Sequence, residues 1–387
     1  MSSTSISAGR GTDRHRGYQV QRVVGLGRGR ETIERQLEEQ GVVLPFAQRA
    51  EWLRMLGYPD STLLVAADEN HSAHAAVAIA IGRSRTLPGH RIYKIERFGA
   101  TEFPEAGDQL LSAVAEAARA DRRCIRVRIE LFERDPHLRQ RLAYTLKELG
   151  FVKSEKPESY VRTPCLDLSP SEEELFAKVA ASARRNVRAP MKRGFELAHL
   201  DDWVYSTRIE QLIDEAYHRT GGKPRRLPWK EILGASRTTP NRSRVVGLLT
   251  PNDKSPAGLV SFAWGCVNGN YVTYEAGAST RHHGVGNLAV AYAPLWNLIA
   301  WAKRQGAAWF DFGGVSEAAG VPHDPLAGIA DFKRFFSGHI IEVGEQWILE
   351  PRRIRAMIAR ALSAAVRRSR ALTEAATPIA LPPADAR

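Results

Sequence analysis

Strand-like and helix-like segments follow one another in the same order twice along the chain, and this repetition limits the fold more than any other feature of the sequence. Three strand-like segments between residues 62 and 99 are followed by a helix, a strand and a helix that ends at Gly150. Three further strand-like segments between residues 244 and 279 are again followed by a helix, a strand and a helix. Each run can bury its own apolar residues, so the sequence predicts an α+β fold of two tandem domains packed side by side.

The ends of the chain and the joint between the two runs give the expected domain boundaries. Residues 1–17 are small and polar, and residues 372–387 are rich in proline, so both ends are predicted to be disordered tails. The first domain is expected over 18–160 and the second over 161–350. A basic helix is expected over 351–371.

The chain carries an excess of positive charge, with a formal net charge of +12 and a pI of about 9.8. This balance fits an anionic partner such as tRNA, a phosphorylated lipid or a membrane surface, and it also fits a plain arginine-rich surface. The segment from Arg352 to Arg370 carries seven arginines over a modest apolar stripe. Two alternatives stay open for this helix: contact with an anionic membrane or tRNA, or packing on the first domain with its arginines facing water, which we favour.

The cysteines and the apolar segments of the sequence indicate in which cellular compartment the protein is expected. Three widely separated cysteines argue against a disulfide framework or a zinc module and fit a reducing cytosol. The N-terminal residues lack the apolar core of a signal peptide. The uncharged stretch 284–302 is long enough to mimic a membrane span, but Pro294 and a single apolar stripe indicate a buried helix. We therefore expect a cytoplasmic protein, with peripheral contact at the inner membrane face as an option.

A glycine-containing loop follows the last strand of the second run, with the spacing Arg281-x-x-Gly284-x-Gly286. Glycines allow backbone N–H groups to approach phosphate oxygens, a helix N-terminus favours anions, and the arginine adds positive charge. The loop therefore predicts a donor phosphate site formed by these three residues ahead of a helix. The alternative is a tight glycine turn without a ligand.

Three further segments occur in a fixed order along the second run: CLDLSPSEEELFAKVAASARRNVRAPMKRGFEL, WFDFGGVSEAAG and GIADFKRFFSGHIIEVGE. The first contains Ser169-Pro-Ser-Glu172, a capping-box pattern. Taken together, the three segments resemble the FemABX family of peptidoglycan aminoacyltransferases. The resemblance covers residues 160–350 through these motifs, and residues 40–160 through the general pattern.

The resemblance implies two tandem domains of the GNAT acetyltransferase type. It also implies transfer of an aminoacyl group from aminoacyl-tRNA to an amine of a peptidoglycan precursor, which in some cases is lipid-linked, without a metal or a permanently bound cofactor. The family's important lysine falls on Lys333, with Phe332 beside it, and Arg219 approximately matches a substrate-binding arginine. Ser337-Gly338 replaces the usual second glycine pair.

The same residues can be read from their chemistry. Lys333 could stabilise negative charge that develops on the acyl group or neutralise a leaving group that carries phosphate, and the alternative is an ordinary exposed lysine of a helix. Asp311 could act as a base or orient the attacking amine. Asp311 could equally cap its strand. Arg185 and Arg188 share a helix face and could contact an anionic substrate or face water. Tyr274 is a further candidate for substrate binding.

The donor stays open between aminoacyl-tRNA and acyl-CoA, because the Arg-x-x-Gly-x-Gly spacing is closer to the loop that binds coenzyme A. The first hypothesis is aminoacyl transfer to a cell-envelope precursor. The second is an acyl-CoA-dependent N-acyltransferase that acts on an amino sugar or an exopolysaccharide intermediate. The third is a basic protein that binds RNA or membrane without catalysis.

Overall fold

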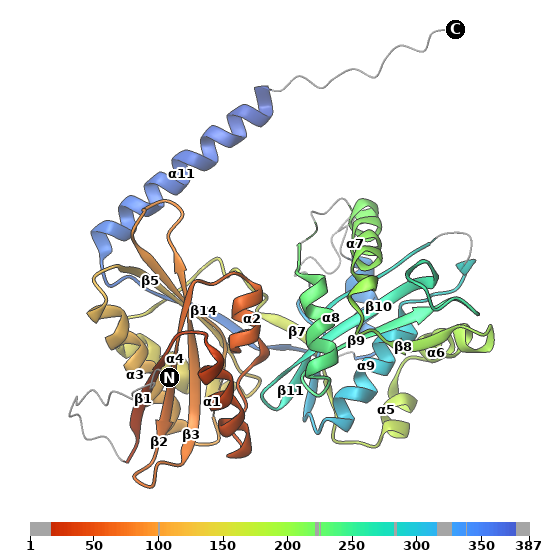
Figure 1. Ribbon diagram of the computed structural model, residues 1–387, viewed down its shortest axis with the longest axis horizontal. Coiled ribbons are helices and arrows are strands. Elements are labelled where there is room, and N and C mark those ends of the chain that lie inside the picture. Colours follow the sequence, from red (N-terminus) through yellow and green to blue (C-terminus); the bar gives the residue numbers. More distant parts are fainter. Residues whose placement is uncertain are drawn as a thin grey trace.

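The computed structural model describes residues 17–99, 101–220, 224, 226–281, 285–315, 327–337 and 339–376. Two α+β domains lie side by side, each built on a seven-stranded sheet with helices against it (Figure 1). Most of the two terminal segments predicted to be disordered lies outside the described residues.

The first sheet is antiparallel except where β4 runs parallel to β5. Its strands in spatial order are β1 (Gln19–Val24), β2 (Asp60–Ala67), β3 (Ala73–Arg83), β4 (Arg91–Phe98), β5 (Cys124–Phe132), β14 (Gly344–Leu349) and β6 (Val152–Lys153). Its helices are α1 (Arg28–Glu39), η1 (Phe46–Gln48), α2 (Ala50–Met55), α3 (Pro104–Ala120) and α4 (Pro136–Glu148).

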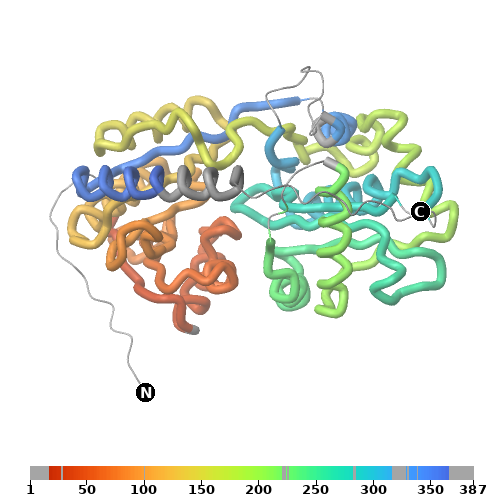
Figure 2. Tube along the Cα trace, turned by 90° about the horizontal axis from the view of Figure 1, so that it is seen from above, coloured from red at the N-terminus to blue at the C-terminus, as the bar shows by residue number. Residues whose placement is uncertain are grey.

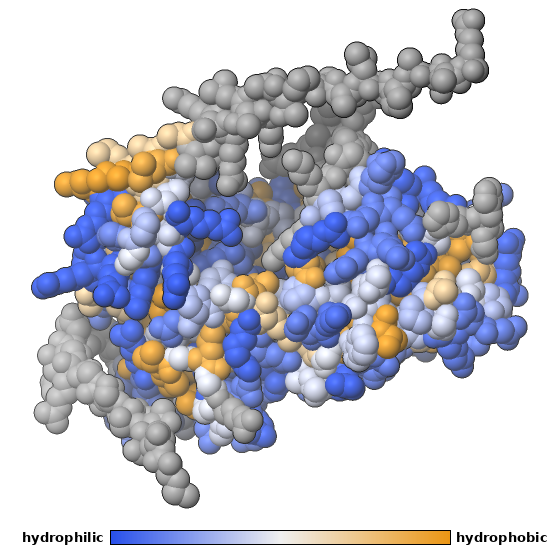
Figure 3. Space-filling view, turned by 45° about the horizontal axis from the view of Figure 1, so that its top comes forward, coloured by the Kyte–Doolittle hydropathy of each residue, from blue (hydrophilic) through white to orange (hydrophobic). Residues whose placement is uncertain are grey.

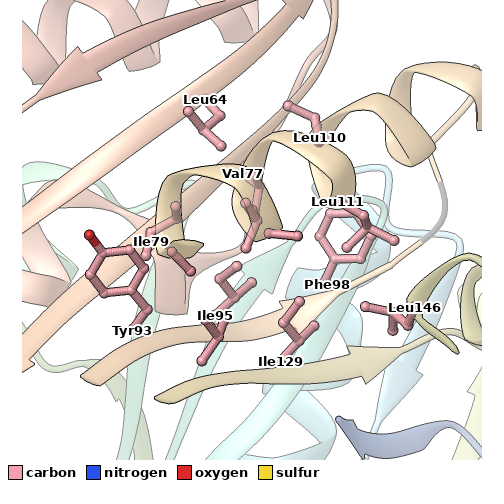
Figure 4. Packing of buried hydrophobic residues seen from close by; sticks show 14 of the residues in the cluster. Leu64, Val77, Ile79, Tyr93, Ile95, Phe98, Leu110, Leu111, Ile129 and Leu146 are labelled. Carbon is pink, nitrogen blue, oxygen red and sulfur yellow. The ribbon is translucent and has the colours of Figure 1, made fainter. Parts of the chain in front are cut away.

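The core of the first domain lies between α3 and the sheet. Leu110 and Leu111 of α3 face Val77, Ile95 and Phe98 of the strands (Figure 4). All five side chains are buried, because the apolar stripe of α3 meets the apolar faces of β3 and β4. This packing gives the first domain a core of its own.

The second sheet is also mixed, with β11 parallel to β12. Its strands in spatial order are β13 (Ile340–Glu342), β7 (Arg162–Asp167), β12 (Trp309–Asp311), β11 (Tyr271–Ser279), β10 (Leu259–Asn268), β9 (Ser243–Leu249) and β8 (Glu196–His199). The helical segments are α5 (Glu172–Lys178), α6 (Ala181–Lys192), η2 (Trp203–Tyr205), α7 (Ser206–Thr220), α8 (Trp229–Thr238), η3 (Pro256–Gly258), α9 (Tyr292–Arg304) and α10 (Ala327–Arg334).

The chain returns to the first domain near its end. The segment HIIEVGEQWIL (residues 339–349) has the pattern of a single strand, and the sequence predicts it as one. In the structure it is split at Val343 into β13, which pairs with β7, and β14, which pairs with β5. The range 161–350 expected for the second domain therefore includes a strand that belongs to the first sheet. Figure 2 shows this crossing as a blue segment that leaves the second domain and lies among the yellow segments of the first.

Three local expectations differ from the structure. The capping box forms between Ser171 and Glu174, not at Ser169, because the Ser169 hydroxyl is bonded to Asp167 at 2.8 Å. The helical stretch expected to continue through residue 194 is interrupted between α5 and α6, whereas Pro190, expected to kink or end this helix, lies two residues before the end of α6 at Lys192. The last helix, α11 (Arg353–Ala376), extends beyond residue 371, into the segment expected to be a tail.

Within the described ranges, no helix is both long enough and apolar enough to cross a membrane.

Candidate active site

Strands β11 and β12 separate beside the motif Asp311-Phe-Gly-Gly314. They pair through three positions only, from Tyr271 opposite Trp309 to Thr273 opposite Asp311, although β11 continues to Ser279. A bulge at Glu275 interrupts the pairing of β11 with β10 just beyond this point. Bulges bend a strand and often lie beside functional sites. The separation of these two strands therefore marks a candidate functional site.

Lys333, on the last turn of α10, points its ammonium group toward the end of β12. Its side chain is buried, with the residue 7% exposed, and Nζ donates hydrogen bonds to the carbonyl oxygens of Gly314 at 2.7 Å and Gly313 at 3.2 Å. Burial lowers the pKa of this ammonium to about 8, and the negative charge of Asp311 opposes the shift. At neutral pH the site therefore holds a buried cation, the form suited to stabilise developing negative charge.

Neighbouring atoms leave no room for a side chain at the two residues after Phe312, which are both glycine. Gly313 has a φ of +73°, and a Cβ there would lie 3.3 Å from the carbonyl oxygen of Tyr274. A Cβ on Gly314 would lie 2.5 Å from the Cβ of Tyr160. The Gly-Gly pair thus lets the backbone carbonyl groups reach Lys333 between β11 and the segment that enters β7.

Asp311 is completely buried and accepts five hydrogen bonds. Its Oδ1 accepts from the Thr163 hydroxyl at 2.6 Å and from the Gly313 N–H at 2.8 Å. Its Oδ2 accepts from the Tyr160 hydroxyl at 2.5 Å, the Thr273 hydroxyl at 3.2 Å and Arg97 Nη1 at 3.3 Å. Four of these donors fill the roughly four lone-pair sites of a carboxylate, and the contact with Arg97 is the longest of the five. This geometry suits a carboxylate that holds the turn at Gly313 in place. The role of Asp311 as a base stays a prediction.

Arg97 was not identified from the sequence, yet it links the two domains at this point. It lies at the end of β4 with a φ of +53°, which is rare for a residue other than glycine. Its guanidinium donates to the Tyr160 hydroxyl at 2.8 Å and lies over the ring of Phe132, 4.5 Å from the centroid. The segment RIYKIERF shows only an arginine in a strand, so no local signal distinguishes Arg97 from its neighbours.

Three stacked aromatic rings continue the contact between the domains. Phe132 of β5 stacks on Tyr271 and Trp309 of the second sheet, with centroids 5.4 and 6.2 Å apart, and the latter two rings are 4.3 Å apart. Such stacks add packing energy beyond the apolar area that they bury. The Asp311 and Lys333 region is therefore held against the first domain by buried aromatic contacts.

Phe332 and Tyr274, both predicted to bind substrate, contribute to the packing around Lys333. The ring of Phe332 contacts those of Tyr292 at 4.8 Å and Phe336 at 5.7 Å. Burial raises the pKa of the Tyr274 phenol, and its hydroxyl occupies the space where a Cβ of Gly277 would lie. Substrate contact by either residue stays a prediction.

Arg219 and Arg281, far apart in the sequence, come together at the end of β11. Arg219 lies in the last turn of α7 and donates from Nη2 to the carbonyl oxygen of Ser279 at 3.1 Å. Burial lowers the pKa of Arg219, and the positive charge of the exposed Arg281 lowers it further. Two guanidinium groups that repel each other form a place where an anion would be stabilised.

The loop between Arg281 and α9 differs from the expected phosphate cradle. Gly284 lies outside the described residues. Gly286 has a φ of +54°, and α9 begins only at Tyr292, so the prediction of a helix directly after Gly286 was wrong. The side chains of Val285 and Val290 are buried against Phe195 and Leu248, which holds this segment as a turn. The arginine pair, not a helix N-terminus, supplies the positive charge here.

Arg185 and Arg188 lie on the exposed side of α6. The guanidinium of Arg188 lies 4.8 Å from the ring centroid of Phe176. Their neighbour Arg184 instead donates to the carbonyl oxygens of Ala177 and Val179, and so holds the joint between α5 and α6. A substrate contact by Arg185 or Arg188 stays a prediction. Across the described residues, no cluster of three histidine, cysteine or acidic side chains is arranged to hold a metal ion.

Comparison with solved structures identifies the fold. The crystal structure of FemX superposes with a TM-score of 0.64 at 15% identity, covering 81% of this chain and 94% of the FemX chain. The C-terminal domain of a putative lysylphosphatidylglycerol synthetase from Agrobacterium fabrum gives a TM-score of 0.49 at 14% identity, covering 87% and 96%. A tandem GNAT protein from the clavulanic acid biosynthesis pathway gives 0.43 at 14% identity, covering 86% and 99%. These two weaker likenesses carry no part of the fold assignment, which rests on FemX.

The architecture is that of two tandem α+β domains, each built on a seven-stranded mixed sheet. Within that class the chain has the fold of FemX, so the FemABX-like fold expected from the motifs is confirmed. Sequence comparison with known families and with curated proteins gave no match.

Proposed function

We propose that this protein is an N-acyltransferase that moves an aminoacyl group from aminoacyl-tRNA to an amine of a peptidoglycan or other cell-envelope precursor. The observation that carries the proposal is the buried Lys333 ammonium, held by the carbonyl groups of Gly313 and Gly314 where β11 and β12 separate. The FemABX-like fold supports the same chemistry.

In the proposed reaction the neutral amine of the acceptor attacks the carbonyl carbon of the aminoacyl ester. A C–N bond forms, the C–O bond to the tRNA breaks, and the amine proton leaves with the released hydroxyl group. Within the described part of the chain Lys333 donates to two carbonyl oxygens, so an ammonium group keeps a third N–H for an oxyanion. A fixed donor of this kind lowers the barrier because negative charge grows on the oxygen only in the transition state.

The pair Arg219 and Arg281 is proposed to bind the phosphate groups of the donor. Its position at the end of β11, the strand that borders the Lys333 region, supports this role. The same arginine pair keeps a second candidate function open, in which acyl-CoA is the donor and an amino sugar or exopolysaccharide intermediate is the acceptor. The Arg281-x-x-Gly-x-Gly spacing favours that alternative.

The donor can be identified by titrating coenzyme A into the purified full chain by calorimetry. Arg281→Glu is the test variant, and Arg193→Glu, an exposed arginine of the second domain, is the matched charge reversal. Micromolar binding that only Arg281→Glu abolishes assigns acyl-CoA as the donor. If coenzyme A does not bind, and aminoacyl-tRNA binds with the same dependence on Arg281, the primary proposal stands.

Transfer itself is tested with Lys333→Ala. Wild-type protein should form an amide from a labelled donor and a peptidoglycan-type amine, and the variant should lose most of this rate while keeping its circular dichroism spectrum. Equal rates for the two proteins would refute the role of Lys333.

A further inference from the structure

Helix α11 exposes a stripe of large apolar side chains. Ile354 is 73% exposed, Met357 is 57% exposed, and Ile358 and Leu362 are exposed as well. At about 100° per residue, these positions fall on one side of the helix. Figure 3 shows hydrophobic residues gathered at its upper left, where α11 begins.

The opposite side of α11 packs on the first domain through small residues. Ala356 and Ala359 are buried, and the hydroxyl of Ser363 lies 3.5 Å from that of Thr86. A surface helix ordinarily turns its large apolar residues toward the core. Here the small residues face the domain and the large ones face outward, so folding of the chain leaves the apolar stripe without a partner among the described residues.

Basic groups border the stripe on both flanks. By helical geometry Arg353 and Arg360 lie on one flank and Arg355 on the other. Arg355 and Ile358 also line an open hollow of about 540 Å³, together with His90, Arg122 and Arg123 of the first domain. No acidic residue lines this hollow or lies between residues 351 and 372. Arg360 is paired with the carboxylate of Glu350 at 2.5 Å, so the positive charge beside the stripe comes from Arg353, Arg355 and the two arginines of the first domain.

We propose that α11 docks the protein on an anionic membrane surface, with the apolar stripe below the lipid headgroups and the flanking arginines at the phosphates. A helix that lies in the plane of the interface needs this division into an apolar face and basic flanks. A second copy of the chain fits less well, because two such faces would bring their arginines together. RNA would meet the arginines but leave the apolar stripe in water.

The position of α11 allows such docking. In Figure 1 the helix rises above the first domain on the same upper side of the molecule as α7. Contact through α11 therefore turns this side of the molecule toward the membrane. The inference stands apart from the chemistry at Lys333, since it rests on α11 and its surroundings alone.

The test is co-sedimentation of the full chain with vesicles of phosphatidylglycerol and phosphatidylcholine in equal amounts, and with vesicles of phosphatidylcholine alone. The test variant combines Ile354→Gln, Met357→Gln and Ile358→Gln. Its matched control combines Tyr144→Gln and Val152→Gln, which are 66% and 69% exposed elsewhere on the first domain. Thermal unfolding of all variants shows that each is folded, and light scattering reports the oligomeric state.

We expect wild type and control to bind the anionic vesicles and the triple variant to bind about tenfold more weakly, with little binding to neutral vesicles. A separate variant, Arg353→Gln with Arg355→Gln, should also bind more weakly and lose part of the salt dependence. Three results would overturn the proposal: no binding by wild type, equal binding by the triple variant, or a wild-type dimer that the triple variant converts to a monomer.

Discussion

Arg97 and Asp311 come from different domains, and they form a buried ion pair with Nη1 and Oδ2 3.3 Å apart. Arg97 is the second-last residue of β4 of the first domain, and Asp311 is the last residue of β12 of the second. The same carboxylate accepts a hydrogen bond from the N–H of Gly313, and the carbonyl oxygen of Gly313 accepts a hydrogen bond from Lys333. The position of the proposed catalytic lysine therefore depends on a contact made by the other domain.

Replacing Arg97 should destabilise the protein strongly. Arg97→Met leaves the buried carboxylate of Asp311 without its cationic partner, a change that typically costs about 3–5 kcal/mol. Urea unfolding of wild type and variant measures the difference, and Arg193→Met, at an exposed position, should stay within about 0.5 kcal/mol of wild type. Adding Asp311→Asn to Arg97→Met should recover part of the loss, because it removes the unpaired charge. A negligible effect of Arg97→Met would show that the ion pair does not hold the domains.

The stability of the protein should respond to the titration of Lys333. Its folded pKa is about 8, whereas an unfolded lysine titrates near 10.4. Between these values the unfolded chain retains a proton that the folded chain has lost, so this group makes the free energy of unfolding rise with pH. The full difference corresponds to roughly 3 kcal/mol. The free energy of unfolding of wild type minus that of Lys333→Met should therefore increase from pH 8 to 10, and a flat difference would contradict the lowered pKa.

The catalytic form of Lys333 can be read from the pH dependence of transfer. Lys333→Ala should reduce turnover about a hundredfold or more, as the loss of one oxyanion donor does in other enzymes. If the ammonium is the active form, the ratio of the wild-type rate to the variant rate falls as the pH rises through about 8. The ratio cancels the titration of the acceptor amine, which is common to both proteins. A ratio that rises through the same pH would instead make Lys333 a general base.

Gly313 and Gly314, which follow β12, should tolerate no side chain. In Gly314→Ala the new methyl group would lie 2.5 Å from the Cβ of Tyr160, so Tyr160 must move and its bond to Asp311 with it. We expect a loss of about 1–3 kcal/mol in thermal or urea unfolding. Gly328→Ala is the control, because this exposed glycine of α10 has open space around its Cβ position. There alanine should stabilise the helix by up to about 1 kcal/mol, and equal effects at the two positions would refute the proposed crowding.

The order of strands and helices determined much of this fold in advance. Apolar runs in β2 and β3, alternating apolar residues in β4 and β5, and the stripe of α3 define a first core, and the repeated order defines a second. The resemblance to the FemABX family likewise indicated Lys333 and the Gly313–Gly314 pair, because its motifs are short runs of residues that are adjacent in the sequence. These features depend on contacts within one domain or one turn, which a linear pattern records.

Only the tertiary structure decided the features that join distant segments. Val343 divides one apolar run between two sheets, which no periodicity reveals, since both halves read as one strand. Arg97 and Asp311 are 214 residues apart, and neither carries a local sign of the other. The outward stripe of α11 has the same helical pattern as a buried one. A sequence shows which residues share a face, but whether that face is covered depends on how the rest of the chain packs.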